Sequence, residues 1–304
     1  MKKMHLILML LVATTLLSCT KPASHGMMGI SVNYSVSGKP LITDSLCYCN
    51  EAGNEFMITE IQWFISRIEL QNEQGEWIAL EPRIFYIDTN IPESHTLNIT
   101  SVPVGTYKAL RFIFGLDEEY NHTGLFSDPP ESEMFWPDVL GGGYHYMKLN
   151  GKYVNEEGLL APLAIHLGIG QNADHSEFYQ NYFSVELPIG FTIAENTDNH
   201  LDLTMVIDNW FRNPNLYDFN VYGSAIMQNQ TAQQLLKENG KDVFKIGKPT
   251  ENKNNTDMKK DNSFAEKFRN MMQKAAPKPH FWSWQSVKER MGSPVGTTEK
   301  RQAV

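Results

Sequence analysis

The chain has 304 residues, of which 41% are hydrophobic and 11% aromatic, so its composition is that of an ordinary globular protein and excludes a wholly disordered chain. Its net charge of −9 is unevenly distributed: the segment from Lys245 onward has 13 basic and 6 acidic residues, which leaves −16 on the preceding part. An acidic body followed by a basic tail indicates a molecule in two parts.

The N-terminus resembles the signal of a bacterial lipoprotein. Two lysines precede an apolar run from Leu6 to Leu17, which is too short for an ordinary transmembrane helix. The run ends in Leu16-Leu17-Ser18-Cys19, which is similar to a lipobox and implies lipid attachment to the Cys19 thiol. We therefore expect a signal peptide over 1–18, a lipid-anchored linker over 19–27, and a tether to the outer membrane facing the periplasm. The alternative is a plain signal peptide with an accidental cysteine.

The central part of the chain shows the alternation and turn signals of β-strands. Residues 30–36 alternate apolar with polar side chains, and residues 56–70 form a longer candidate strand whose phase changes. Further strands are expected at 76–80, 84–87, 96–100, 107–114, 144–149, 163–168, 182–187 and 201–207. Only Thr231–Asn239, followed by Gly240, has a convincing helix pattern. These elements predict an all-β fold, a two-sheet antiparallel β-sandwich with one short C-terminal helix.

The basic tail over 247–304 is expected to be largely disordered, because residues 247–263 are polar with almost no apolar anchor. Residues 264–274 place apolar side chains at helical spacing and predict one short amphipathic helix. Three roles stay open for the tail: docking on the acidic body, contact with a membrane or partner, and none in particular. Nucleic-acid binding is not expected of a lipid-anchored chain.

Two cysteines flank Tyr48. On a strand, Cys47 and Cys49 would share one face about 6.6 Å apart, near the upper limit for a disulfide. Two thiols also do not fill a tetrahedral metal site. Three interpretations remain open: a soft-metal site, a strained or redox-active disulfide, and buried or free thiols.

Imidazole, thioether and indole groups gather between Met134 and Gln171. If residues 144–149 form a strand, His145 and Met147 share one face, and small residues around His166 leave room beside its ring. Were the two strands neighbours, both histidines could face each other with Met147 adding its sulfur. Two imidazoles and a thioether suit copper better than magnesium or calcium. The alternative is a pair of core histidines satisfied by backbone carbonyls.

Several segments follow one another in a recognisable order. They are Ile61–Ser66, Val102–Tyr107, Phe112–Asp117, Met134-Phe135-Trp136, Gly143-Tyr144, Lys148–Gly151 and Ile165–Gly168. Together with the lipoprotein start, this order resembles the MbnP-like copper-binding family over most of residues 28–246. The resemblance implies a two-sheet β-sandwich that binds copper. It also implies a partner, a di-haem peroxidase-like enzyme, which oxidises a tryptophan of the binding protein so that it becomes a ligand.

Carried over to this chain, the resemblance implies that Trp136 is the tryptophan to be oxidised and that His166 is a copper ligand. His145, with Met147 or His175 as a third ligand, would complete the site. We expect a non-enzymatic, lipid-anchored protein of the cell envelope that binds copper for acquisition, storage or delivery. The alternative from another class is a metal-free envelope module that binds a protein or a glycan through the aromatic loop from Phe135 to Tyr146.

Overall fold

The structure is a computed structural model that describes residues 24–172, 174, 176–195 and 197–247. The predicted signal peptide, Cys19, His175 and the basic tail beyond Gly247 lie outside these residues. No helix in the described part is long and apolar enough to cross a membrane.

The larger sheet is built around one long strand, β4 (Glu55–Asn72). Along one edge, β4 pairs first with β9 and then with β8, and the register shifts between Ser66 and Glu69, where Arg67 has a positive φ of 50°. This register shift is the structural counterpart of the change of phase that the sequence shows within residues 56–70. On this side, β10 (Leu160–Leu167) pairs with the outer edge of β9 (Met147–Val154), and β13 (Phe183–Ile193) pairs with the outer edge of β8 (Gly105–Phe114). The other edge of β4 holds β3 (Tyr48–Cys49), β6 (Ile84–Asp88) and β5 (Trp77–Ala79).

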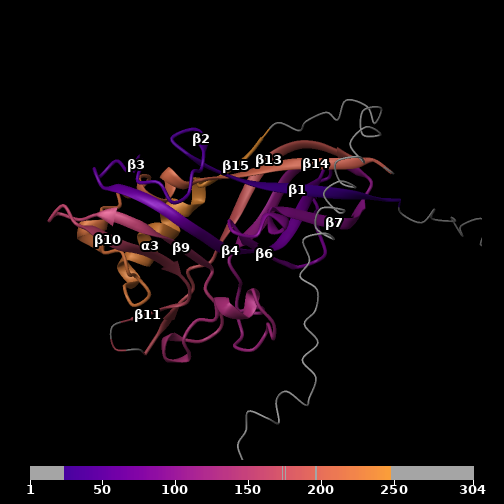
Figure 1. The fold of residues 1–304 in the computed structure, drawn as a ribbon. Coiled ribbons are helices and arrows are strands. Elements are labelled where there is room, and N and C mark those ends of the chain that lie inside the picture. The colour runs from indigo at the N-terminus through magenta and orange to yellow at the C-terminus, as the bar shows by residue number, and fades with distance from the viewer. Residues whose placement is uncertain (1–23, 173, 175, 196, 248–304) are drawn as a thin grey trace, which may run out of the picture. The chain divides into compact units, whose positions relative to one another are not determined.

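The second sheet crosses the first, and its longest strand, β1, lies beside β14 (Figure 1). Its strands are β15 (Phe244–Ile246), β14 (Asp198–Val206), β1 (His25–Val36), β2 (Lys39–Pro40) and β7 (Thr96–Pro103). The pair β1–β14 is parallel, which the sequence did not predict, while the other pairs of this sheet are antiparallel.

Short elements complete the fold. They are the strand pair β11 (Gly170–Gln171) and β12 (Phe178–Tyr179), the helices α2 (Phe219–Tyr222) and α3 (Gln230–Asn239), and 3-10 turns at Pro92–His95, Glu131–Met134, Asp138–Leu140, Ile207–Phe211 and Gly240–Asp242. The predicted C-terminal helix is α3, and the Asn229 side chain caps it by accepting from the Ala232 amide.

The two sheets meet in an aromatic core. Trp63 of β4 stacks on Phe114 of β8 with ring centroids 5.8 Å apart, and Phe244 of β15 lies 5.3 Å from the Trp63 ring. The indole nitrogen of Trp63 donates to the hydroxyl of Tyr34 on β1 at 3.0 Å, so a buried hydrogen bond also joins the sheets. The predicted β-sandwich is confirmed.

The segment 115–146 leaves the sheet where β4 changes partner. The amide of Phe64 donates to the carbonyl of Tyr146, and the amide of Gly115 donates to the carbonyl of Phe64, so both ends of the segment are held at one residue of β4. Its two 3-10 turns lie on the same side of the sheet as β11 (Figure 1). This segment carries Trp136 and His145.

Candidate metal centre

Trp136 lies between the two 3-10 turns and is almost fully buried. Its backbone amide donates to the Gly143 carbonyl, and its indole nitrogen donates to the Leu140 carbonyl at 3.0 Å. One face of the ring packs on the backbone of Gly168: a Cβ at that position would lie 2.4 Å from the indole. The indole is therefore held in one orientation by two neighbouring segments.

The glycine triplet makes this arrangement sterically accessible. Gly141, Gly142 and Gly143 all have positive φ, which favours glycine over other residues. A Cβ on Gly143 would also lie 2.3 Å from the side-chain oxygen of Asn121, which accepts from the Tyr144 amide. The chain thus turns back so that Tyr144 bridges to Phe135 and His145 arrives beside Trp136.

His145 is a buried histidine, and one of its two ring nitrogens makes a hydrogen bond. Its Nδ1 lies 2.9 Å from the Met134 carbonyl, which can only accept, so Nδ1 carries the proton. Its Nε2 is buried and has no hydrogen-bond partner. Burial, followed by the charges of His166 and Lys148, lowers the pKa of His145 to about 3 despite the bond to Met134. At neutral pH the ring is therefore uncharged and holds a buried, unpaired lone pair.

In His166 the other ring nitrogen, Nε2, makes the hydrogen bond. Its Nε2 lies 2.8 Å from the side-chain oxygen of Asn150, whose amide nitrogen donates to Glu60 at 3.2 Å. Because the carboxylate only accepts, Asn150 must present its oxygen to His166, and Nε2 must carry the proton. Burial, together with the charge of Lys148, lowers the pKa of His166 to about 4. Its lone pair is on Nδ1.

The three rings form a row. The centroids of Trp136 and His145 are 4.7 Å apart, and those of His145 and His166 are 5.1 Å apart with the ring planes at 83°. Two imidazoles on one ion, with bonds of about 2.0 Å at a tetrahedral angle, have centroids about 5 Å apart. The spacing, the neutral rings and the unpaired Nε2 of His145 fit a metal bound between the two histidines.

Comparison with known proteins assigns the chain to a family. The sequence profile of the family described as MbnP matches residues 25–231. The chain belongs to the MbnP family. A solved structure, MbnP from Methylosinus trichosporium, shares the fold with a TM-score of 0.50 at 13% sequence identity, and the alignment covers 74% of this chain and 99% of that one. A search of curated proteins returned no match.

Membership of the MbnP family associates this chain with a copper-related role. The rings described above are His166 and Trp136, which the resemblance indicated, and His145, which was predicted from its position in the sequence. Within the described residues, no group of three or more His, Cys, Asp and Glu side chains is arranged to hold a metal ion. Within the described residues, a copper ion at these rings would therefore have two imidazoles and no third ligand from those four residue types.

The structure places Met147 elsewhere. Met147 pairs with Trp63 and Leu167 and belongs to the hydrophobic core, whereas His166 pairs with Lys148 on the opposite face of the sheet. The expectation that His145 and Met147 share a face is wrong, because the strand begins only at Met147 and His145 precedes it in the bend after the glycines. His175 is outside the described residues.

Sequence reasoning missed the residues that support the two imidazoles. Asn150 and Glu60 set the protonated nitrogen of His166, and Lys148, which donates to the Glu133 carbonyl at 2.7 Å, helps to keep both rings neutral. Alternation could have found Asn150, because it lies two residues after Lys148 on the same face of β9. Nothing in the sequence pairs Glu60 with β9, since that pairing is long-range.

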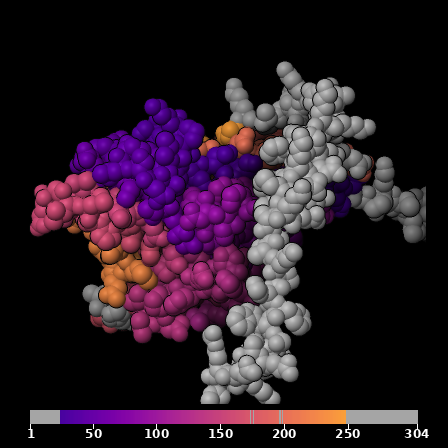
Figure 2. Space-filling model, viewed as in Figure 1, coloured from indigo at the N-terminus to yellow at the C-terminus, as the bar shows by residue number. Residues whose placement is uncertain are grey.

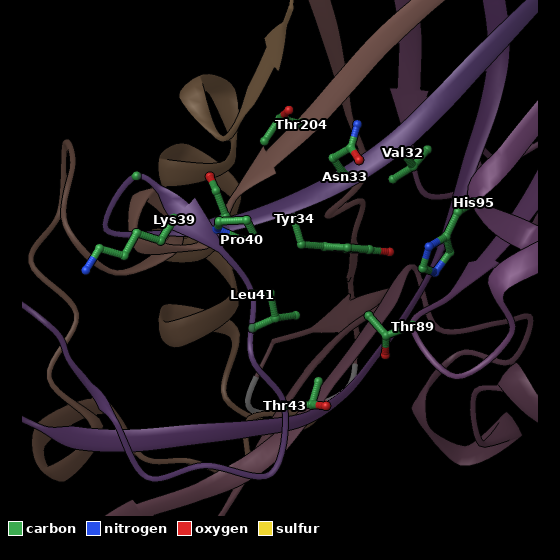
Figure 3. Close-up of a pocket in the computed structure, with 12 residues that line it drawn as sticks. Val32, Asn33, Tyr34, Lys39, Pro40, Leu41, Thr43, Thr89, His95 and Thr204 are labelled. Carbon is green, nitrogen blue, oxygen red and sulfur yellow. The ribbon is translucent and has the colours of Figure 1, made fainter.

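Among the pockets in the described part, two are of similar size. One of about 520 Å³ is lined by Leu140, whose carbonyl accepts from Trp136, and by residues 227–231. The other, of about 580 Å³, lies at the second sheet, where Tyr34, Leu41 and His95 face the same space (Figure 3). None of the predicted copper ligands lines either pocket, and the link between the pocket beside Leu140 and the row of rings is the hydrogen bond from Trp136 to the Leu140 carbonyl.

Proposed function

We propose that this protein binds copper between His145 and His166, for acquisition, storage or delivery, and has no catalytic activity of its own. The buried, unpaired Nε2 of His145 beside a second neutral imidazole carries the proposal. A buried polar atom without a partner costs free energy, and coordination would remove that cost. Neutral imidazoles suit copper, and no proton has to leave the free lone pairs before the ion binds.

Trp136 is the candidate for oxidation by a di-haem peroxidase-like partner. With peroxide as the oxidant of that partner, two oxygen atoms would open the indole ring, and hydrolysis would then release one ring carbon as formate. The kynurenine that remains has one carbon fewer and one oxygen more, so the mass rises by about 4 Da and a carbonyl and an aromatic amine replace the indole. The ring already lies 4.7 Å from His145, where new donor atoms could supply the third ligand that the described residues lack. Peptide mass measurement on protein from native cells tests this, and an unmodified Trp136 contradicts it.

The binding test uses the full chain. Equilibrium dialysis with Cu(I) and with Cu(II) should give stoichiometric binding that is lost in His166→Ala and in His145→Ala. His200→Ala is the matched control, because His200 lies on the other sheet and bonds to Ser31. Absence of binding by wild type, or equal binding by all variants, contradicts the proposal.

We further propose that Cys19 carries a lipid that tethers the protein to the cell envelope, at the outer membrane facing the periplasm. The sequence Leu16-Leu17-Ser18-Cys19 after a short apolar run supports this. Metabolic labelling with a fatty acid should mark wild type and not Cys19→Ala. Label in both, or in neither, contradicts the anchor.

A second function, an envelope module that binds a protein or a glycan without metal, is favoured by one observation. Phe135 is 61% exposed and Val139 is 80% exposed, although both flank the buried Trp136. Exposed apolar side chains mark a contact surface where they form one contiguous patch, which this alternative requires of Phe135 and Val139. Under this alternative, Phe135→Ser and Val139→Ser abolish partner capture, while copper has no effect on it.

A further inference from the structure

The residues on either side of His145 are both hydrogen-bonded to one side chain, that of Asn121. The side-chain oxygen of Asn121 accepts from the Tyr144 amide at 2.8 Å. Its side-chain nitrogen donates to the Tyr146 hydroxyl at 3.3 Å. Because a backbone amide can only donate, the Tyr144 amide fixes the orientation of the Asn121 amide group, and this orientation also suits Tyr146. His145 therefore lies between two residues that the same amide group holds.

Both bonds are sheltered from solvent. Segment 115–146 forms part of the molecular surface, in the magenta region of Figure 2, but Tyr144 is 2% exposed and Tyr146 is fully buried. Asn121 can approach Tyr144 because the preceding residue, Gly143, has no side chain. Without Asn121, the Tyr144 amide would lose its acceptor in a buried position, and the chain would have to shift to satisfy it.

Asn121 is itself anchored to β4. Its backbone amide donates to the Asp117 carbonyl at 2.8 Å, and the Asp117 carboxylate forms an ion pair with Arg67. The Arg67 guanidinium lies over the Tyr120 ring, 4.7 Å from its centroid. Arg67 has a positive φ and lies where β4 changes partner. A continuous series of contacts therefore leads from the register shift of β4 to the residues beside His145.

Thr123 holds the same loop at two further points. Its hydroxyl accepts from the Gly143 amide at 2.9 Å and donates to the Asp138 carboxylate at 3.0 Å. The ring of His145 itself makes one hydrogen bond, from Nδ1 to the Met134 carbonyl. The position of the backbone therefore helps to decide where the unpaired Nε2 of His145 points.

We propose that Asn121 is a positioning residue of the candidate metal centre: by holding the chain on both sides of His145, it directs the Nε2 of His145 toward His166. The ligands of a metal site must be held within about 0.5 Å of the productive geometry. Asn150 supports one imidazole at its ring, and Asn121 supports the other through its backbone. The effect on copper rests on the proposed function, whereas the effect on the His145 ring is a property of the metal-free protein.

The metal-free full chain provides the first test. The Nδ1 proton of His145 is buried and hydrogen-bonded, so it should give a resolved NMR signal and exchange slowly with water. Asn121→Ala should accelerate this exchange, because the chain beside His145 is released. Asn72→Ala is the matched control and should leave the exchange unchanged. Asn72 likewise accepts from a backbone amide, that of Glu76, and donates to a side chain, but in the turn between β4 and β5.

Copper provides the second test. Competition with a Cu(I) chelator should show an affinity about tenfold lower for Asn121→Ala than for wild type. Electron paramagnetic resonance of the Cu(II) form should show an altered hyperfine splitting. Asn121→Asp keeps an acceptor for the Tyr144 amide and should recover most of the affinity. A variant that is only less stable binds less copper with an unchanged spectrum, so the spectrum separates positioning from stability.

Wild-type exchange of the His145 ring proton in Asn121→Ala overturns the proposal, and so does a lower copper affinity with an unchanged spectrum. If Asn121→Ala does not fold, Tyr146→Phe removes one of the two bonds by deleting a single oxygen atom, and wild-type exchange in that variant overturns the proposal. If wild type binds no copper, the proposed function fails, while the exchange measurement still decides the role of Asn121.

Discussion

The two imidazoles of the candidate site differ in which ring nitrogen makes a hydrogen bond to the protein. The Nδ1–H of His145 donates a hydrogen bond to a backbone carbonyl, and the Nε2–H of His166 donates one to the side-chain oxygen of Asn150. A backbone acceptor at His145 cannot be removed by substitution, but the acceptor at His166 can. Substitution can therefore test whether the site depends on the tautomer of His166, but not whether it depends on that of His145.

Substitution of Asn150 should weaken copper binding without abolishing it. Asn150→Ala removes the acceptor from His166 Nε2, so the ring can adopt either tautomer and rotate. Loss of such a supporting bond typically lowers metal affinity about 10–100-fold. Competition with a Cu(I) chelator measures the change, and Asn33→Ala, an exposed asparagine on the other sheet, is the control. Equal affinities of the two variants would show that Asn150 plays no part.

Acid should destabilise the metal-free protein through the same two histidines. Their pKa values are about 3 and about 4 in the folded state, against about 6.5 in the unfolded chain. As pH falls from about 6.5 to 4, the unfolded chain binds protons at these positions and the folded chain does not, so the free energy of unfolding decreases. Each residue contributes up to about 1.4 kcal/mol per pH unit.

Denaturant unfolding between pH 7 and pH 4.5 measures this dependence. His166→Ala should show a shallower loss of stability with acid than wild type, since one of the two titrating groups is gone. Identical slopes would mean that His166 has an ordinary pKa in the folded protein. His25→Ala is the comparison, because His25 is exposed.

At the level of elements, the site exists because one strand changes partner. Segment 115–146 leaves β4 at Phe64 and folds over the face of β9 and β10 that points away from the core, burying His145 and Trp136 there. Alternation alone would leave His166 exposed to solvent. Because the segment covers this face, His166 is half-buried beside two other rings. The site is a contact between a sheet face and a loop.

The close approach of Trp136 to Gly168 gives an element-level prediction. Gly168→Ala places a methyl group 2.4 Å from the indole, so the ring or the start of the 168–170 segment must move. Such overpacking costs about 1–3 kcal/mol and should also weaken copper binding, because His145 rests against the same indole. Gly190→Ala is the control, since nothing lies within 4 Å of its added Cβ and its φ is not positive. Wild-type stability in both variants would contradict the packing.

Local patterns predicted the elements better than the site. Each of the long strands overlaps a predicted one, because apolar patterns and turn signals are properties of neighbouring residues. The strand at 144–149 was predicted too early, since the positive φ values of the glycines delay its start to Met147. His145 and His166 do meet as predicted, but through the bend before β9 rather than through alternation, and long-range partners such as Glu60 left no local signal.

For the molecule as a whole, the described body closes with β15. Phe244 is buried between the sheets, with ring centroids 5.3 Å from both Trp63 and Phe112, and β15 pairs with β14. Strands from both ends of the described body, β1 and β15, therefore flank β14 in one sheet. Any truncation that keeps the fold must retain these residues.

Two truncations should separate the sandwich from the C-terminal residues beyond it. A chain that ends at Thr250 keeps β15 and should unfold at the temperature of the full chain, whereas one that ends at Val243 lacks Phe244 and should be destabilised by at least about 3 kcal/mol. In the full chain, Phe244→Ala should reproduce most of that loss, and Lys245→Ala, whose side chain is exposed, should not. Calorimetry measures all four proteins. Destabilisation of the chain that ends at Thr250 would show that residues 251–304 contribute to the stability of the sandwich, because β15 and its aromatic contacts are intact in that protein.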